Sequence, residues 1–280
     1  MDFLDNFGTT IVGVLLDITK AFEGLMDELK VTPKEFLGGG MWKTTQSISE
    51  LLKPIAWTLL ILFFLLELME QLKKKDMQQD EAMYEITWIL VKLAIAKLIA
   101  DNVADIINLI FATSKNMVTT LEKGKALVTV GQDTSKMQTF MDKIEQTYNG
   151  WNKGLGDKLI NYLLVTIMKL GSDILKVLAK IVIQIRNIEI YVHIALGSII
   201  SSTIISKEYN DIFKRWIKKL VALALQVILI SVCILVYYQY INVIDYPSDI
   251  NGMWIIIGGQ ILLVMSMFQT GGWAKSLLGV

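Results

Sequence analysis

The sequence predicts an all-α, polytopic integral membrane protein with about five transmembrane helices and additional amphipathic helices. Of its 280 residues, 53% are hydrophobic and 19% are charged, and the mean hydropathy is +0.49, which is too apolar for an average soluble domain. Residues 220–241 run for 22 positions without a formal charge, long enough to cross a hydrocarbon core of about 30 Å. Elsewhere, apolar residues recur at helical spacing.

Residues 1–50 are expected to form an external amphipathic helix followed by a turn. Apolar side chains alternate at intervals of about three and four residues from Leu4 to Leu29, and the opposite face carries six acids and two lysines, a net charge of −4. A helix on the anionic cytoplasmic leaflet would be basic, so we expect this one to lie outside or to pack on protein. The following GGGMWKTT run is not a phosphate loop, because Trp42 occupies the position that requires glycine.

Residues 51–112 are expected to contain the first two transmembrane helices. The first, at 51–69, has Pro54 in its first turn, where backbone donors lack helical partners in any case. The second, from about residue 86, carries Lys97, Asp101 and Asp105 within about 80° of one another. Because a charge at mid-membrane costs about 2.5 to 3.5 kcal/mol, this face should meet protein or water. Two interpretations stay open: a buried ion pair between Lys97 and Asp101, or the wall of a conduit.

The middle of the chain consists of a polar segment followed by an amphipathic one. Residues 113–158 are polar and are expected to form an external loop with a helical patch at 137–148. Residues 159–187 are expected to form an amphipathic helix, because polar positions recur every three or four residues as a net basic stripe. Its lysines either reach lipid phosphates or line a water-filled passage for a polyanion or unfolded protein. The charged positions of this stripe are Lys169, Asp173, Lys176 and Lys180.

The distribution of basic residues predicts the topology. Residues 188–280 are expected to form a C-terminal transmembrane region with a cytoplasmic loop at 206–219. Short cytoplasmic loops collect Lys and Arg, and two segments are clearly basic, 73–75 and 207–219. If both are cytoplasmic, an even number of crossings separates them. The result is five spans in the bacterial cell membrane, with the N-terminus outside and the C-terminus in the cytoplasm. A six-span alternative would place the second basic segment outside.

The sequence contains no recognisable catalytic or metal-binding motif. With one histidine and one cysteine, the chain can form neither a histidine-rich zinc motif nor an internal disulfide. We therefore expect no catalytic residues, no metal and no cofactor, and hence a protein that is not an enzyme. The net charge is zero, so no global basic field indicates a surface for nucleic acid.

Three short sequence elements lie between residues 195 and 232. They are Ala195, Leu196 and Gly197, then Phe213 and Trp216 in a polar stretch, and then Gln226 after an Ala-Leu pair in the following span. This pattern, about forty residues long, resembles the core signature of the TrbL-like polytopic membrane subunits of type IV secretion and conjugation systems, in their compact Gram-positive form. Ser198 stands where this family commonly has proline, so the local kink of that family is in question here.

The resemblance implies a non-enzymatic channel or scaffold subunit that supports transfer of single-stranded DNA with its attached protein across the cell membrane. It implies assembly with an ATPase, a bitopic scaffold protein and other subunits, and transient contact with the DNA strand. Small residues spaced four apart at Gly197 and Ser201 let helices approach closely, and we expect a homo-oligomer. The resemblance also implies that Trp216 anchors its loop at the level of the lipid headgroups. Neighbouring cations would meet lipid phosphates or the ATPase: Lys214, Arg215, Lys218 and Lys219.

Two other functional classes remain open at this point. A small-solute or ion transporter would use the charges inside the membrane as its pathway, and it would be expected to show inverted repeats or broken spans. A structural membrane scaffold would need no conduit.

Overall fold

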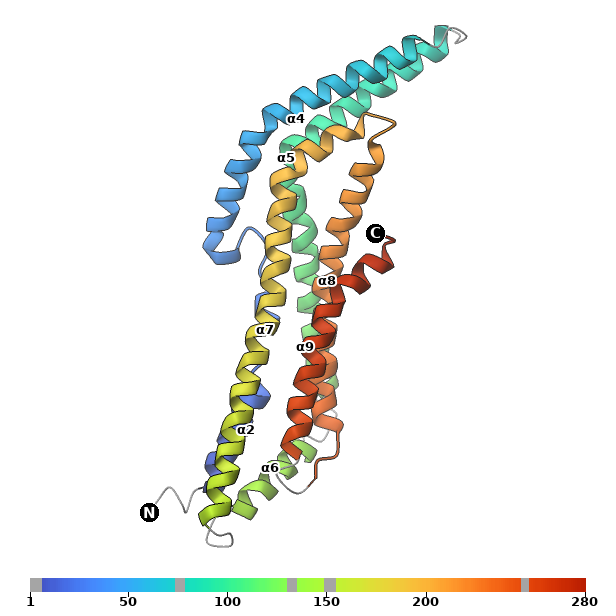
Figure 1. The fold of residues 1–280 in the computed structure, drawn as a ribbon. Helices are drawn as coiled ribbons and strands as arrows, with labels where there is room; N and C mark the ends of the chain where they lie inside the picture. Colours follow the sequence, from blue (N-terminus) through green and yellow to red (C-terminus); the bar gives the residue numbers. More distant parts are fainter. Residues whose placement is uncertain (1–6, 74–78, 130–134, 149–154, 248–251) are drawn as a thin grey trace. The chain divides into compact units, whose positions relative to one another are not determined.

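The computed structural model describes residues 7–73, 79–129, 135–148, 155–247 and 252–280, and the regular secondary structure in these ranges is entirely helical. The predicted all-α class is therefore confirmed. Contacts divide the chain into two compact units. The first comprises Met1–Lys30, Met117–Gln184 and Val227–Gly271. The second comprises Val31–Asn116, Ile185–Gln226 and Gly272–Val280. Figure 1 shows the helices coloured along the sequence.

Within these described ranges, three helical segments are long and apolar enough to cross a membrane. They are Phe36–Leu72, which contains α4 (Gly40–Leu72), then α8 (Asn210–Val243) and α9 (Gly252–Leu277). The prediction of a membrane protein is confirmed. The two further spans of the five-span topology would come from α5 (Gln79–Thr129) and α7 (Leu155–Ser201). These two helices are not among the three candidate spans, because polar and charged residues interrupt their apolar stretches. Five spans therefore stay a prediction.

The glycine-rich turn before α4 depends on left-handed backbone angles. Leu37, Gly38 and Gly39 have φ values of 48°, 65° and 78°, and glycine adopts this region without a steric penalty. The turn starts the helix at Gly40, earlier than the residue 51 expected from hydrophobicity. Pro54 therefore lies in the helix interior and not in its first turn, which corrects the sequence-based expectation. Polarity marks where a membrane span begins, whereas the backbone can be helical well before that point.

The N-terminal amphipathic segment is two helices and not one. α2 (Phe7–Lys20) and α3 (Leu25–Leu29) are separated by a tight turn with bonds from Ala21 N–H to Ile18 O and from Glu23 N–H to Lys20 O. Gly24 precedes α3, and glycine weakens a helix by about 1 kcal/mol relative to alanine. The predicted apolar face is buried in both helices and in the turn between them: Ile11, Leu15, Ile18, Phe22, Leu25 and Leu29.

The segment expected as an external polar loop is helical in most of its described residues. α5 continues to Thr129, well past the expected end near residue 112, and α6 (Ser135–Tyr148) covers the expected helical patch. The sequence explains the extension, since no Pro or Gly interrupts residues 79–123. Likewise α7 joins the expected amphipathic helix and the start of the next span in one helix of 47 residues. The expected loop at 206–219 is shorter, because α8 begins at Asn210.

In the first unit, the N-terminal helices pack on segments far away in sequence. The ring of Phe22 packs edge to face on the ring of Tyr237 in α8, with 5.8 Å between the ring centroids. The side chain of Gln260 in α9 donates to the Ile18 carbonyl at 2.7 Å, and Thr9 donates to Glu145 of α6 at 2.9 Å. These contacts tie α2 to α6 and α9, and the turn after α2 to α8.

In the second unit, a small apolar cluster joins α4, α5 and the segment between α7 and α8. Leu60 of α4, Ile89 and Ala96 of α5, and Ile205 after the 3-10 turn η2 (Ser202–Ile204) are almost completely buried. Phe63 of α4 packs beside this cluster and against the ring of Tyr209, with 5.5 Å between the ring centroids. The cluster holds the end of α7 and the start of α8 against the first two long helices of this unit.

Candidate functional site

Three of the signature residues, Gly197, Phe213 and Trp216, meet at a crowded helix junction in the second unit. Gly197 of α7 faces Val103 of α5 and the indole of Trp216 in α8. A Cβ atom at Gly197 would clash with a Val103 methyl and lie 2.9 Å from Trp216 Cζ2. Real Cβ atoms do not approach other heavy atoms this closely, so any larger residue here would force a neighbouring side chain or the backbone to move. Trp216 is only 4% exposed, and Phe213 lies beside it with ring centroids 5.7 Å apart.

Ser198, next to this glycine, fixes the same junction by hydrogen bonds. Its hydroxyl donates to the Ala100 carbonyl of α5 at 2.8 Å and lies 3.4 Å from the hydroxyl of Ser49 in α4. α5 departs from helical geometry nearby, at Asn102 (φ −116°, ψ 17°), whose side chain donates to the Leu98 carbonyl. A kink leaves carbonyl groups available, and Ser198 satisfies one beside it. The expected close approach of helices through small residues is therefore present.

The other signature residues have different environments. Ala195 and Gln226 are half-buried, and Leu196 is exposed. The burial of Trp216 corrects the expectation that its ring anchors a loop at the headgroups, because an indole enclosed by Gly197 and Phe213 cannot contact lipid. Trp216 acts instead as a packing residue.

The charged face of α5 contains the expected ion pair. Lys97 Nζ lies 3.1 Å from Asp101 Oδ2, and Trp57 of α4 donates its indole N–H to Asp101 Oδ1 at 3.1 Å. The Lys97 ammonium also lies 5.8 Å from the centroid of the Trp57 ring, within cation–π range. The expected burial is absent in the single chain, since the Lys97 and Asp101 side chains are 61% and 29% exposed. Asp105 is exposed on the same helix.

Two lysines of the basic stripe of α7 pair with acidic residues of α2 and α3 in the same unit. Lys169 Nζ lies 2.7 Å from Asp17 Oδ2 of α2, and Lys180 Nζ lies 2.6 Å from Glu28 Oε1 of α3. The hydrogen bond to Lys169 and its charge lower the pKa of Asp17, and the same bond raises the pKa of Lys169. Neither sequence interpretation of the stripe anticipated this pairing, although the opposite net charges of the two segments were visible in the sequence.

The remaining charged positions of the stripe are not part of these two pairs. Asp173 is exposed and Lys176 is half-buried. The stripe is therefore neither a row of lysines free to reach lipid nor an open basic wall along its whole length.

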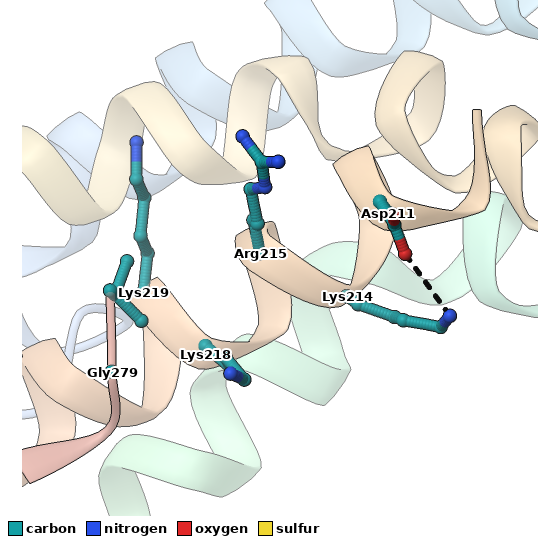
Figure 2. Close-up of a pocket in the computed structure, with 7 residues that line it drawn as sticks. Asp211, Lys214, Arg215, Lys218, Lys219 and Gly279 are labelled. Atoms are coloured by element: carbon teal, nitrogen blue, oxygen red, sulfur yellow. Dashed lines mark hydrogen bonds and ion pairs between the residues drawn. The ribbon is translucent and has the colours of Figure 1, made fainter. Parts of the chain in front are cut away.

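A concave basic pocket of about 560 Å³ lies at the start of α8 (Figure 2). It contains all four cations that the resemblance singled out, and these belong to the first three turns of the helix and not to a loop. Lys214 forms an ion pair with Asp211 at 3.1 Å, whereas the other three cations form no ion pair with any residue that the structure describes. The lining residues are Asp211, Lys214, Arg215, Lys218, Lys219, Gly279 and Val280.

Comparison with protein families identifies the chain. The model of a family described as TrbL/VirB6 plasmid conjugal transfer like protein matches residues 18–198, well over half of the chain. The chain belongs to this family. It is thus a membrane component of a conjugal transfer or type IV secretion system and works in a complex with other subunits. No curated protein and no solved structure matches the chain in the same comparisons.

The region matched to the TrbL/VirB6 family contains only part of the signature. Ala195, Leu196 and Gly197 fall within residues 18–198, and so do both partners of the Lys97–Asp101 pair. Phe213, Trp216 and Gln226 lie beyond the matched residues. The structure nevertheless connects the two parts, since Gly197 and Trp216 are in contact.

The structure also adds residues of this TrbL-like chain that the sequence did not single out as a site. Glu67 near the end of α4 is 4% exposed at its side chain, lies 3.0 Å from Lys207 Nζ, and accepts the Lys207 backbone N–H at 3.2 Å. Arg186 is fully buried in α7, and its Nη2 donates to Asn187 Oδ1 at 2.8 Å. The signal for both was the presence of charge in apolar stretches, but only tertiary contacts show their partners.

Proposed function

We propose that this chain is a non-enzymatic channel or scaffold subunit of a conjugative type IV secretion system, which supports transfer of single-stranded DNA with its attached protein across the cell membrane. The match to the TrbL/VirB6 family over residues 18–198 carries this proposal. The three long apolar helices support residence in the membrane. The junction of α4, α5, α7 and α8 supports a structural role, because it joins four helices through packed and hydrogen-bonded residues.

The proposed topology has five spans, an external N-terminus and a cytoplasmic C-terminus. Its regions are an external segment at 1–50, two spans within 51–112, external residues 113–158, the amphipathic part of α7 at 159–187 and a C-terminal membrane region at 188–280. The basic start of α8 supports a cytoplasmic location for residues 207–219. In the other basic segment Lys73 is described, while Lys74 and Lys75 lie outside the described residues.

The functional proposal is tested by deleting the gene in its conjugative element and restoring it from a separate plasmid. Donor counts, transconjugants per donor and recovery of the membrane complex are measured together. The expected result is loss of transfer in the deletion and its return with the restored gene. Formaldehyde crosslinking of the transferring strand then separates a channel from a scaffold, since only a channel subunit is recovered with the DNA. Normal transfer by the deletion strain would refute the proposal.

The topology is tested separately with single cysteines in a Cys233→Ser background. A membrane-impermeant maleimide should label a cysteine at Asp245 in intact cells, whereas cysteines at Lys73 and Lys218 should react only after the membrane is opened. External labelling at position 218 would contradict the five-span arrangement and favour six spans.

A further inference from the structure

The basic pocket at the start of α8 has more positive charge than the chain itself neutralises. Four cations line the pocket together with one acidic side chain, that of Asp211, which pairs with Lys214. Arg215, Lys218 and Lys219 have no ion-pair partner in the part of the chain that the structure describes. Unpaired cations grouped in one concavity favour an anion, because each lowers the electrostatic cost of holding negative charge there.

The geometry of the side chains suits a single phosphate group. Arg215 and Lys219 are one helical turn apart, and Figure 2 shows their side chains extending in the same direction, with Gly279 beside Lys219. A guanidinium can bind two phosphate oxygens at once, and an ammonium adds a mobile point charge. A pocket of about 560 Å³ is also within the usual size range for small ligands.

The position along the helix indicates where this phosphate would come from. Lys219 is followed directly by Leu220, the first residue of the 22-residue uncharged run in α8. α8 is one of the helices apolar enough to cross a membrane, and a span formed by its uncharged run would place the pocket at the boundary between hydrocarbon and headgroups. Lipid phosphates lie at this depth.

Apolar side chains near the pocket distinguish a lipid from other anions. Ile212, Val221 and Leu277 are 49%, 40% and 68% exposed. Ile212 and Val221 flank the cationic turns in sequence, and Leu277 comes two residues before the pocket residue Gly279. Acyl chains would cover such residues, whereas a DNA strand or a free phosphate ion would leave them in water.

We propose that this pocket binds the headgroup phosphate of an anionic phospholipid, with Arg215 and Lys219 as its direct ligands and Lys218 adding positive charge to the same pocket. The proposal does not depend on the role of the chain in DNA transfer.

The test uses the full-length protein in nanodiscs of phosphatidylcholine with or without phosphatidylglycerol, and it measures lipids retained after detergent extraction by native mass spectrometry. The variant Arg215→Gln/Lys218→Gln/Lys219→Gln is compared with Lys20→Gln/Lys34→Gln/Lys43→Gln, which removes the same charge from exposed positions outside the pocket. Each cation near an anionic surface contributes about a factor of five. The pocket variant should therefore bind phosphatidylglycerol roughly a hundredfold more weakly, whereas the control should retain most of its affinity.

A second variant separates loss of charge from a folding defect. Lys218→Arg/Lys219→Arg keeps the charge and should retain the lipid, which shows that loss in the glutamine variant follows from charge. Equal loss in the pocket and control variants would overturn the proposal. Inorganic phosphate that binds the pocket as tightly as the lipid would also overturn it, because the ligand would then be a soluble anion. Preferential binding of a single-stranded oligonucleotide, abolished in the glutamine variant, would overturn it as well.

Discussion

Gly197→Ala isolates the contribution of the helix junction to stability. The added methyl group would overlap Val103 and approach Trp216, so one of these side chains or the helix backbone must move. Overpacking of this kind costs about 1 to 3 kcal/mol. The same change also gains about 1 kcal/mol of helix propensity, so the net loss alone would underestimate the packing effect.

Gly171→Ala provides the matched control. Gly171 lies in the same helix, and a Cβ atom there meets no neighbour within 4 Å. This variant should gain the propensity term without the packing cost. The difference in unfolding free energy between Gly197→Ala and Gly171→Ala should therefore equal the overpacking cost, about 1 to 3 kcal/mol.

The assay is thermal or denaturant unfolding of the purified protein in detergent, with membrane abundance and conjugation frequency measured in parallel. Val103→Ala removes the methyl groups nearest the new side chain, so Gly197→Ala should cost less in that background than in the wild type. If Gly197→Ala and Gly171→Ala proved equally stable, the crowded junction would not exist as described.

Three further predictions concern charged residues. Asp101→Asn and Lys97→Met should each lower membrane abundance. The double variant should recover part of this loss, because it leaves no unpaired charge. Reduced transfer at normal abundance, without rescue in the double variant, would favour a conduit. Lys207→Met should destabilise by about 3 to 5 kcal/mol in thermal unfolding because it leaves the Glu67 carboxylate buried without a counter-ion. Glu67→Gln should cost less, since its amide oxygen can still accept the backbone N–H; equal losses would contradict this account. The pKa of Glu35 is lowered by the Thr32 backbone N–H and by Lys115, so its stabilising effect is present above its ordinary pKa and is lost as the pH falls through the lowered value. Glu35→Gln should flatten this part of the acid unfolding curve, and an unchanged curve would argue against the pairing.

The sequence was sufficient to predict the faces of several helices. The apolar positions from Ile11 to Leu29 are buried, as their spacing indicates, and Lys97 and Asp101 form the pair that a four-residue separation allows. Helix ends were predicted less well. α5 passes through the polar residues after 112, because a change in polarity ends a membrane span without breaking hydrogen bonds along the backbone.

The candidate site was only partly visible in sequence. Gly197 and Trp216 were identified through a signature, but an exposed anchoring role was inferred for a tryptophan that is buried. The 18 residues between them do not indicate that the indole ring of Trp216 packs against α7. Direct contact with Gly197 depends on the short turn at η2 and on the packing of α5 behind it.

The sequence by itself determined the helical class, the membrane environment and the periodic faces of each helix, because these follow from hydrophobicity and from 3.6 residues per turn. Only the tertiary structure decided which faces meet. Asp17 binds Lys169 across 152 positions and Glu67 binds Lys207 across 140, separations at which local spacing has no influence. Such pairs form because packing of the apolar faces brings their helices together, and the charges beside those faces then find partners.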